Sequence, residues 1–235
     1  MMPAEFRDPR DFEAMVGAGA WFRALAPAFQ GRLLDAAAVR QLEDGESLFA
    51  KGDRPDGVYC VVAGGLRMTT VSQAGRLAML AIAEPPQWFG EIALFDGEPR
   101  SHDAWATGPT TVLHVRQQPL MALLDESPRH WHSLGLLLTH KLRSAFTAIE
   151  EVALLSAEQR LARRLVALAD GWGQSPGRSK REIRVPQEQL GQMLALSRQT
   201  VNQLLQQLAS SGAIRLVRGA IEIVDLDALR RLSAG

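Results

Sequence analysis

One stretch, from Trp131 to Leu155, constrains the fold most because its apolar residues recur at steps of three and four. The repeat consists of Trp131, Gly135, Leu138, Leu142, Ala145, Ile149 and Val152. This spacing predicts a long helix that packs along a partner helix. Short β-like runs precede the stretch and helical patterns follow it, so the helix connects two unlike domains. The alternative is an amphipathic helix that lies on its own β domain.

Residues 39–116 have a strand-like pattern, in which short apolar runs such as GVYCVVAG and LAMLAIA alternate with turn signals such as EDGE and EPP. This pattern predicts a β-roll or small sandwich. We expect positive φ angles at its turn glycines, which are Gly45, Gly52, Gly57, Gly64 and Gly75. Helical spacing within 21–38 predicts one or two short helices, and residues 1–19 are expected to form a loosely held lead-in.

Further boundaries follow from helix signals. Gln117 to Asp125 has the pattern of a short helix, and Ser127-Pro128 is a start signal for the long one. A capping box at Ser156 to Gln159 starts a new helix. Residues 171–180 have the composition of a loop, and 183–185 are expected to form a short strand.

Residues 187–205, QEQLGQMLALSRQTVNQLL, have the pattern of a helix-turn-helix, with small Gly191 where the helices approach. A predicted N-cap, Ser197, starts the second helix. Arginine suits the guanine edge, glutamine and asparagine suit the adenine edge, and threonine suits a thymine methyl or a phosphate. The candidate DNA-binding residues are Ser197, Arg198, Gln199, Thr200, Asn202 and Gln203. Gly212 ends this helix, a hairpin near 218–220 follows, and Asp225 caps a last helix, which together predict a winged helix.

Charge and cysteine content agree with this division. Residues 1–155 carry 14 Lys+Arg against 19 Asp+Glu, whereas 156–235 carry 12 against 7, so the basic part is C-terminal and suits a polyanion partner. Cys60 is the only cysteine, which excludes a disulfide framework and an iron–sulfur sensor and suggests a core position. Neither a signal peptide nor a membrane-spanning run is visible, so we expect a cytoplasmic protein without membrane contact.

The order of β-roll, long helix and winged helix-turn-helix resembles the CRP/FNR (catabolite activator protein-like) family of transcription regulators, from about Trp21 onward. LSRQTVNQLLQQL is similar to the recognition-helix signature of the family, and FGEIALFDGEPRS resembles the phosphate-binding cassette of cyclic-nucleotide-binding domains. The resemblance implies an α+β chain that is not an enzyme. It divides the chain into a lead-in (1–20), a β-roll effector domain (21–130), a dimerisation helix (131–155) and a winged helix-turn-helix domain (156–235).

The cassette supplies the candidate ligand-binding residues. Free amides at the start of a short helix can hold a phosphate, which Arg100 can reach with its planar fork. By resemblance, Glu91 accepts from a ribose hydroxyl and Ser101 adds a phosphate contact. The predicted set is Gly90, Glu91, Ile92, Ala93, Arg100, Ser101 and, on the long helix, Phe146. The alternative is that Glu91 and Arg100 pair across a surface turn.

Departures from the family leave the effector open among cyclic AMP, cyclic GMP and cyclic di-GMP. His102 and Asp103 follow Ser101, where the family has a small residue. Ala145 and Phe146 are the nearest match by spacing to the Thr and Ser of cyclic-AMP responders and offer no hydroxyl, although Phe146 can stack on a base. Gln199 and Gln203 replace a frequent glutamate and arginine, so the usual target sequence of the family is not expected.

We therefore expect a homodimeric regulator that binds a palindromic site on double-stranded DNA, with RNA polymerase as a further partner. A regulator with an unused pocket and a heme sensor, with His114 as one conceivable ligand, stay open as alternatives. A cupin-like metal enzyme, built on His102, Asp103 and His114, is a remote one, because no His-x-His with a suitable third ligand lies in the roll. The operator, the target genes and the direction of regulation are not encoded in any motif.

Overall fold

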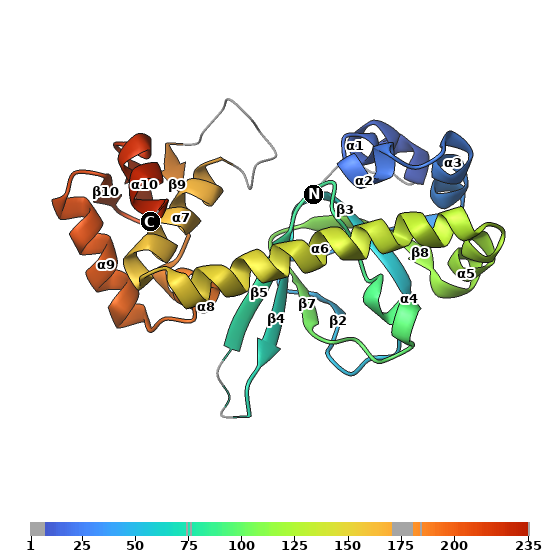
Figure 1. Ribbon diagram of the computed structural model, residues 1–235, viewed down its shortest axis with the longest axis horizontal. Helices are drawn as coiled ribbons and strands as arrows, with labels where there is room; N and C mark the ends of the chain where they lie inside the picture. Colours follow the sequence, from blue (N-terminus) through green and yellow to red (C-terminus); the bar gives the residue numbers. More distant parts are fainter. Residues whose placement is uncertain (1–7, 74, 76, 171–180, 184, 235) are drawn as a thin grey trace. The chain divides into compact units, whose positions relative to one another are not determined.

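The computed structural model describes residues 8–73, 75, 77–170, 181–183 and 185–234 (Figure 1). The predicted loop at 171–180 lies outside the described residues. The chain divides into two compact units, Met1–Arg143 and Ser144–Gly235, and each is described by itself. Their boundary falls inside one long helix, α6 (Pro128–Leu154), which begins at the predicted start signal.

The first unit contains two four-stranded antiparallel sheets, which confirms the predicted β-roll. One has the order β1-β8-β3-β6 and the other β2-β7-β4-β5. The strands are β1 (Ala37–Leu42), β2 (Ser47–Phe49), β3 (Gly57–Ala63), β4 (Leu66–Val71), β5 (Leu77–Ala83), β6 (Trp88–Phe89), β7 (Asp103–Ala106) and β8 (Thr110–Arg116). All five predicted turn glycines have positive φ. At Gly57, a Cβ atom would lie 2.1 Å from the Val115 carbonyl oxygen, so only glycine fits there.

Strand β3 shows how the sequence alternation builds the interior. Val58, Cys60 and Val62 belong to the core that the strand shares with the helices, whereas Tyr59 and Val61 belong to the core with the second sheet. Because side chains alternate across a strand, one continuous apolar run covers both faces. Cys60 is buried as predicted, and this burial raises the pKa of its thiol.

The N-terminal segment corrects one prediction. From Asp8 onward the expected loose lead-in is instead ordered into η1 (Pro9–Phe12) and α1 (Glu13–Gly17), followed by α2 (Ala20–Arg23) and α3 (Pro27–Asp35). Figure 1 shows these helices gathered beside the β-roll. Phe12 and Val16, four residues apart, are both buried in the core of the first unit. The alternating charges around them obscured this short apolar face.

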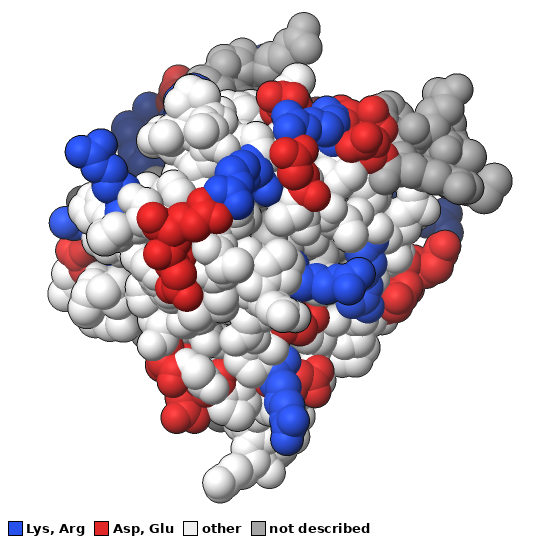
Figure 2. Space-filling model, turned by 90° about the vertical axis from the view of Figure 1, so that its right-hand side faces the viewer, with Lys and Arg blue, Asp and Glu red and all other residues white. Residues whose placement is uncertain are grey.

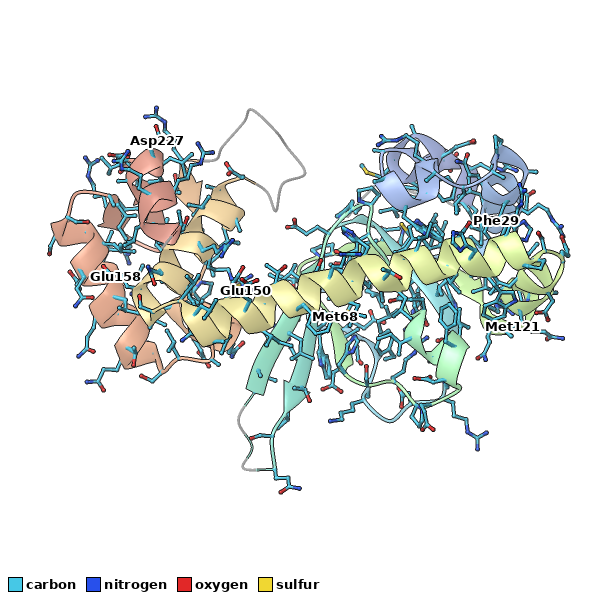
Figure 3. All side chains as sticks on the ribbon, viewed as in Figure 1. Phe29, Met68, Met121, Glu150, Glu158 and Asp227 are labelled. Atoms are coloured by element: carbon cyan, nitrogen blue, oxygen red, sulfur yellow. The ribbon has the colours of Figure 1, made fainter. Side chains whose placement is uncertain are left out.

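The first part of α6 packs on its own domain. Leu134 and Leu137 are buried on it, and His130 stacks on Phe29 of α3 with ring centroids 4.0 Å apart (Figure 3). α5 (Gln117–Asp125) precedes this helix and has the predicted bounds. Trp131 also packs against this core, so the first residue of the predicted repeat faces its own domain.

The last four positions of the repeat lie on an exposed apolar face of α6, whereas Gly135 and Leu138 are half-buried. Leu142, Ile149 and Val152 are 53%, 62% and 65% exposed, and Ala145 between them is exposed too. We call these four residues the seam. Apolar side chains at i, i+3, i+7 and i+10 on an exposed helix face are typical of a surface that meets another helix.

The second unit is a winged helix-turn-helix. Its elements are α7 (Ala157–Ala169), β9 (Glu182–Ile183), α8 (Gln187–Leu194), α9 (Arg198–Ser210), β10 (Ile214–Val217), β11 (Ala220–Ile223) and α10 (Leu226–Ser233). β10 and β11 form the predicted hairpin, and β9 pairs with β11 but ends at Ile183, short of the expected Val185. Three predicted caps are present: Ser156 forms a capping box with Gln159, Ser197 caps α9, and Asp225 caps α10.

The surface carries mixed charge on the face drawn in Figure 2, where acidic and basic side chains are interspersed. Among the described helices, none combines the length and the hydropathy that a membrane-spanning segment needs.

Candidate functional sites

The predicted cassette, residues 89–101, runs from β6 through α4 (Ile92–Asp96) to the start of β7. Gly90 has a φ of 97°, and a Cβ atom there would lie 2.9 Å from the Gly57 carbonyl oxygen. Glycine therefore allows the chain to pass close to β3 and to turn Glu91 into the start of α4. Ile92 is exposed and Ala93 is buried.

Glu91 is a buried carboxyl with one oxygen in use. It is 1% exposed, and its Oε2 accepts a hydrogen bond of 2.7 Å from Nζ of Lys141 on α6. Burial lowers the pKa of Lys141, and Glu91 opposes that shift. The Oε1 atom is buried and has no hydrogen-bond partner among the described residues. A buried carboxylate oxygen without a partner is costly, so this atom is suited to a ligand donor.

Arg100 is also buried, with an exposed fraction of 5%. It donates to Asp56 Oδ1 at 2.5 Å and to the carbonyl oxygens of Gly57 and Gly90 at 2.8 and 3.2 Å. Its Cζ lies 4.6 Å from the ring centroid of Phe49. Its Nε is buried and, within the described chain, has no partner. Arg100 thus resembles Glu91 in having one unused polar atom.

Asp56 orients Arg100. Its carboxylate also accepts a 2.5 Å hydrogen bond from the Tyr59 hydroxyl, and His114 Nε2 lies 3.7 Å from it. Partial burial raises the pKa of Asp56, but the hydrogen bonds from Tyr59 and Arg100 and the positive charge of Arg100 outweigh burial, so the net shift is downward. The carboxylate stays charged and holds the arginine fork in one orientation.

These contacts exclude the alternative interpretation of the cassette, in which Glu91 and Arg100 form a surface pair. Glu91 and Arg100 do not pair across a surface turn, because both are buried and each has another ionic partner. Ser101 is exposed, and its hydroxyl lies 2.9 Å from His102 Nδ1. Phe146 is 62% exposed on the part of α6 that belongs to the second unit.

The residues of the metal-enzyme alternative are used otherwise. His114 stacks on Tyr59 at 4.3 Å and contacts the Asp56 carbonyl oxygen through Nε2, while Asp103 accepts from the Lys51 amide. Among the described residues, no group of three or more His, Cys, Asp or Glu side chains is arranged to hold a metal ion.

The second site is the exposed face of α9. Ser197 Oγ accepts from the Thr200 amide at 3.0 Å and also contacts the Thr200 hydroxyl, so both residues serve the helix start. Four exposed side chains line one open surface hollow, and they are Arg198, Gln199, Asn202 and Gln203. They present donors and acceptors at the N-terminal half of the helix, the part that enters the major groove in this motif.

The two helices of the motif are held by close backbone approach. A Cβ atom at Gly191 of α8 would lie 2.8 Å from the Leu196 carbonyl oxygen, as the sequence predicted for a small residue. Ala195 ends α8 in the left-handed conformation at a φ of 54°. Beneath them lies a buried core to which Leu190, Val201 and Leu205 contribute. The opposite face of α9 from its exposed polar side chains is therefore packed on an apolar core.

Two polar residues that contact the cassette were missed from the sequence, Asp56 and Lys141. A signal for Lys141 exists, because Leu134, Leu137 and Lys141 follow one another at steps of three and four on the inward face of α6. A lysine at the end of a buried apolar stripe indicates a buried acidic partner. Asp56 has no comparable signal, since it lies 44 residues from Arg100 in the sequence, in the loop directly before β3.

Comparison with known proteins gives the same division. Residues 39–127 match the family model of the cyclic nucleotide-binding domain, and residues 159–232 match that of the Crp-like helix-turn-helix domain. The cyclic AMP receptor protein of Thermus thermophilus is 28% identical over 215 residues, which cover 91% of this chain and 96% of that protein.

Solved structures share the fold. A CRP/FNR-family transcriptional regulator from Eubacterium rectale has a TM-score of 0.77 at 17% identity, over 93% of this chain and 100% of that one. The c-di-GMP-responsive global regulator CLP of Xanthomonas campestris has a TM-score of 0.72 at 18% identity, over 84% and 99%. The Crp-like helix-turn-helix match and the Thermus thermophilus relative are those of a regulator family, so the chain is a regulator and not an enzyme. The two matched domains, their order and the curated relative show that the chain belongs to the CRP/FNR family of transcription regulators.

Proposed function

We propose that this regulator acts as a homodimer in the cytoplasm, reads a palindromic DNA site and responds to a nucleotide bound at the cassette. The exposed polar face of α9 carries this proposal. Arg198, Gln199, Asn202 and Gln203 are all exposed around one hollow, and each can meet base edges once the helix lies in a major groove.

The seam supports dimer formation. Leu142, Ala145, Ile149 and Val152 lie exposed along α6, and an identical helix from a second copy covers such a stripe by symmetry. Two α9 helices then enter successive major grooves about 34–36 Å apart on a palindromic site. RNA polymerase is the expected further partner, because a regulator bound beside a promoter acts on the enzyme that transcribes it.

The unused polar atoms of the cassette support a nucleotide effector. Glu91 Oε1 lacks a donor and Arg100 Nε lacks an acceptor among the described residues. A ribose hydroxyl suits the first and a phosphate oxygen suits the second. Cyclic AMP, cyclic GMP and cyclic di-GMP all combine these groups, and relatives are named for cyclic AMP and c-di-GMP. Gly90, Ile92, Ala93 and Ser101 are proposed to complete the site, with Phe146 stacking on a base.

The effector is proposed to act through α6. Lys141 links this helix to Glu91, so a ligand that meets Glu91 also changes the environment of Lys141. The paired helices would then repack or extend near residues 149–155 and reorient the DNA-reading units. A ligand can shift this balance only by its differential affinity for the two arrangements.

One observation favours a second candidate, a regulator that needs no effector. Each charged cassette residue already has an internal partner, Glu91 with Lys141 and Arg100 with Asp56. The pairs stabilise the cassette without any ligand, so the dimer would bind its operator constitutively.

Selection of bound sites from random DNA, with and without each of the three nucleotides, separates these candidates. The proposal predicts enrichment of a two-fold symmetric sequence that depends on one nucleotide. Arg100→Gln should remove the nucleotide dependence while its melting curve stays cooperative. Enrichment of the same sequence without any nucleotide supports the second candidate, and no enrichment under any condition contradicts both.

A further inference from the structure

His102 is a half-buried histidine within the cassette region, at the position where the family has a small residue. Its ring centroid lies 5.9 Å from that of Phe49, and the Arg100 guanidinium lies over the same Phe49 ring at 4.6 Å. The imidazole and the guanidinium therefore contact one buried aromatic ring, and the two residues are only two apart in the chain. The histidine is thus held beside the predicted phosphate-binding arginine.

The charged groups that face His102 come from three segments. Lys141 on α6 and Arg100 in the cassette are positive, while Glu91 and Asp103 are negative. Both carboxylates are already engaged, because Glu91 accepts from Lys141 and Asp103 accepts from the Lys51 amide. Burial, followed by Lys141 and Arg100, lowers the pKa of His102, and the two carboxylates only partly oppose the shift. The imidazole is neutral at neutral pH in this surrounding.

One ring nitrogen of His102 is available. Nδ1 lies 2.9 Å from the Ser101 hydroxyl, whereas Nε2 makes no hydrogen bond with a described residue. We propose that His102 is a second anion-binding residue of this cassette, which takes up a proton as the phosphate of a nucleotide binds beside Arg100. This inference rests on the proposed nucleotide site and adds an anion-binding residue to it.

The physical reason is charge balance. An incoming phosphate offsets the positive charge of Lys141 and Arg100 that disfavours the imidazolium, and it offers the ring nitrogen a charge-assisted acceptor. Binding therefore raises the pKa of His102. At pH values between the pKa of the free protein and that of the complex, binding takes up a proton. The sign follows from linkage: affinity is highest at low pH and falls as pH rises through this window, by at most about tenfold per pH unit for one proton.

Calorimetric titration of the full chain tests this inference, with cyclic AMP, cyclic GMP and cyclic di-GMP as probes between pH 5.5 and 8.5. Two buffers of different ionisation enthalpy report the protons taken up. The wild type should take up as much as one proton per site and lose affinity toward high pH. His102→Ala, which restores a small residue, and the neutral His102→Gln should bind with a flatter pH profile and no such uptake.

His132→Ala is the matched control, because His132 is an exposed histidine on α6. It should keep the wild-type pH profile, and thermal melts check that all variants remain folded. Should the nucleotide bind with the same proton uptake in wild type and His102→Ala, the role of His102 is refuted and the nucleotide site stands. If none of the three nucleotides binds at any pH, this inference and the effector part of the proposed function both fail, while DNA binding is judged separately by site selection.

Discussion

Replacement of Ile149 by lysine should weaken the proposed dimer. Ile149 is 62% exposed in the single chain. Burying a whole isoleucine side chain is worth about 1.5–3 kcal/mol, so covering its exposed part contributes about 1–2 kcal/mol per copy. A two-fold interface counts the change twice, which amounts to about 2–4 kcal/mol. At about 1.4 kcal/mol per factor of ten, the dimer dissociation constant should rise about 30-fold to 700-fold.

Sedimentation velocity over a dilution series measures this constant, and the control is Glu150→Lys. Glu150 is the next residue along α6, about 100° round the helix from Ile149, and its side chain is exposed (Figure 3). Both variants add one lysine to the same helix, and Glu150→Lys makes the larger change in charge. A loss of dimer stability confined to Ile149→Lys therefore reflects the apolar contact at the seam. Equal dimer stability in Ile149→Lys and wild type would falsify the assignment of the seam.

Three further predictions concern the two units separately. Arg198→Ala should weaken binding to the selected DNA site by about 1–3 kcal/mol, or about 5- to 150-fold, and should affect binding to bulk DNA much less. Fluorescence anisotropy measures both affinities. Equal losses of affinity on the two DNAs would refute base readout by Arg198. Gly191→Ala should lower the melting temperature, because overpacking against the Leu196 carbonyl costs about 1–3 kcal/mol and exceeds the helix-propensity gain of up to about 1 kcal/mol. The control is Gly135→Ala, which has open space around the new Cβ atom and should be neutral or stabilising. Asp56→Asn should lower the melting temperature above about pH 5. The difference from wild type should vanish as pH falls through the depressed pKa of Asp56, since the stability that the carboxylate contributes is lost on protonation. A difference in melting temperature that is independent of pH would contradict the charge-based role.

Local signals accounted for most of the fold. Ser156, Ser197 and Asp225 cap helices where the sequence predicted caps, because capping depends on residues only two or three apart. The strand pattern of 39–116 and the turn glycines were sufficient for the β-roll, since each positive φ is a local requirement. The short helices before Ala20 were missed because Phe12 and Val16 are their only buried residues.

The cassette was predictable as a segment but not as a set of contacts. The motif brings Glu91 and Arg100 to one region, and the helix start after Glu91 follows from local pattern. Their partners, Lys141 and Asp56, lie 50 and 44 residues away in sequence. Spacing marks Lys141 as a lysine at the end of a buried stripe, but which acidic residue it meets depends on how α6 packs, and the pairing of Asp56 has no local signal. The proximity of His102 to Arg100 and Lys141 likewise emerged only from the folded chain.

The position of Cys60 has a practical consequence for labelling chemistry. The only thiol of the chain is fully buried and its pKa is raised, so maleimide or methanethiosulfonate reagents should leave it intact in the folded protein. Gln206→Cys, on the exposed side of α9, would then be the single reactive position in each copy. In the proposed dimer, spin labels at this position would report the distance between the two α9 helices, with and without nucleotide. That distance can be compared with the length of one DNA turn.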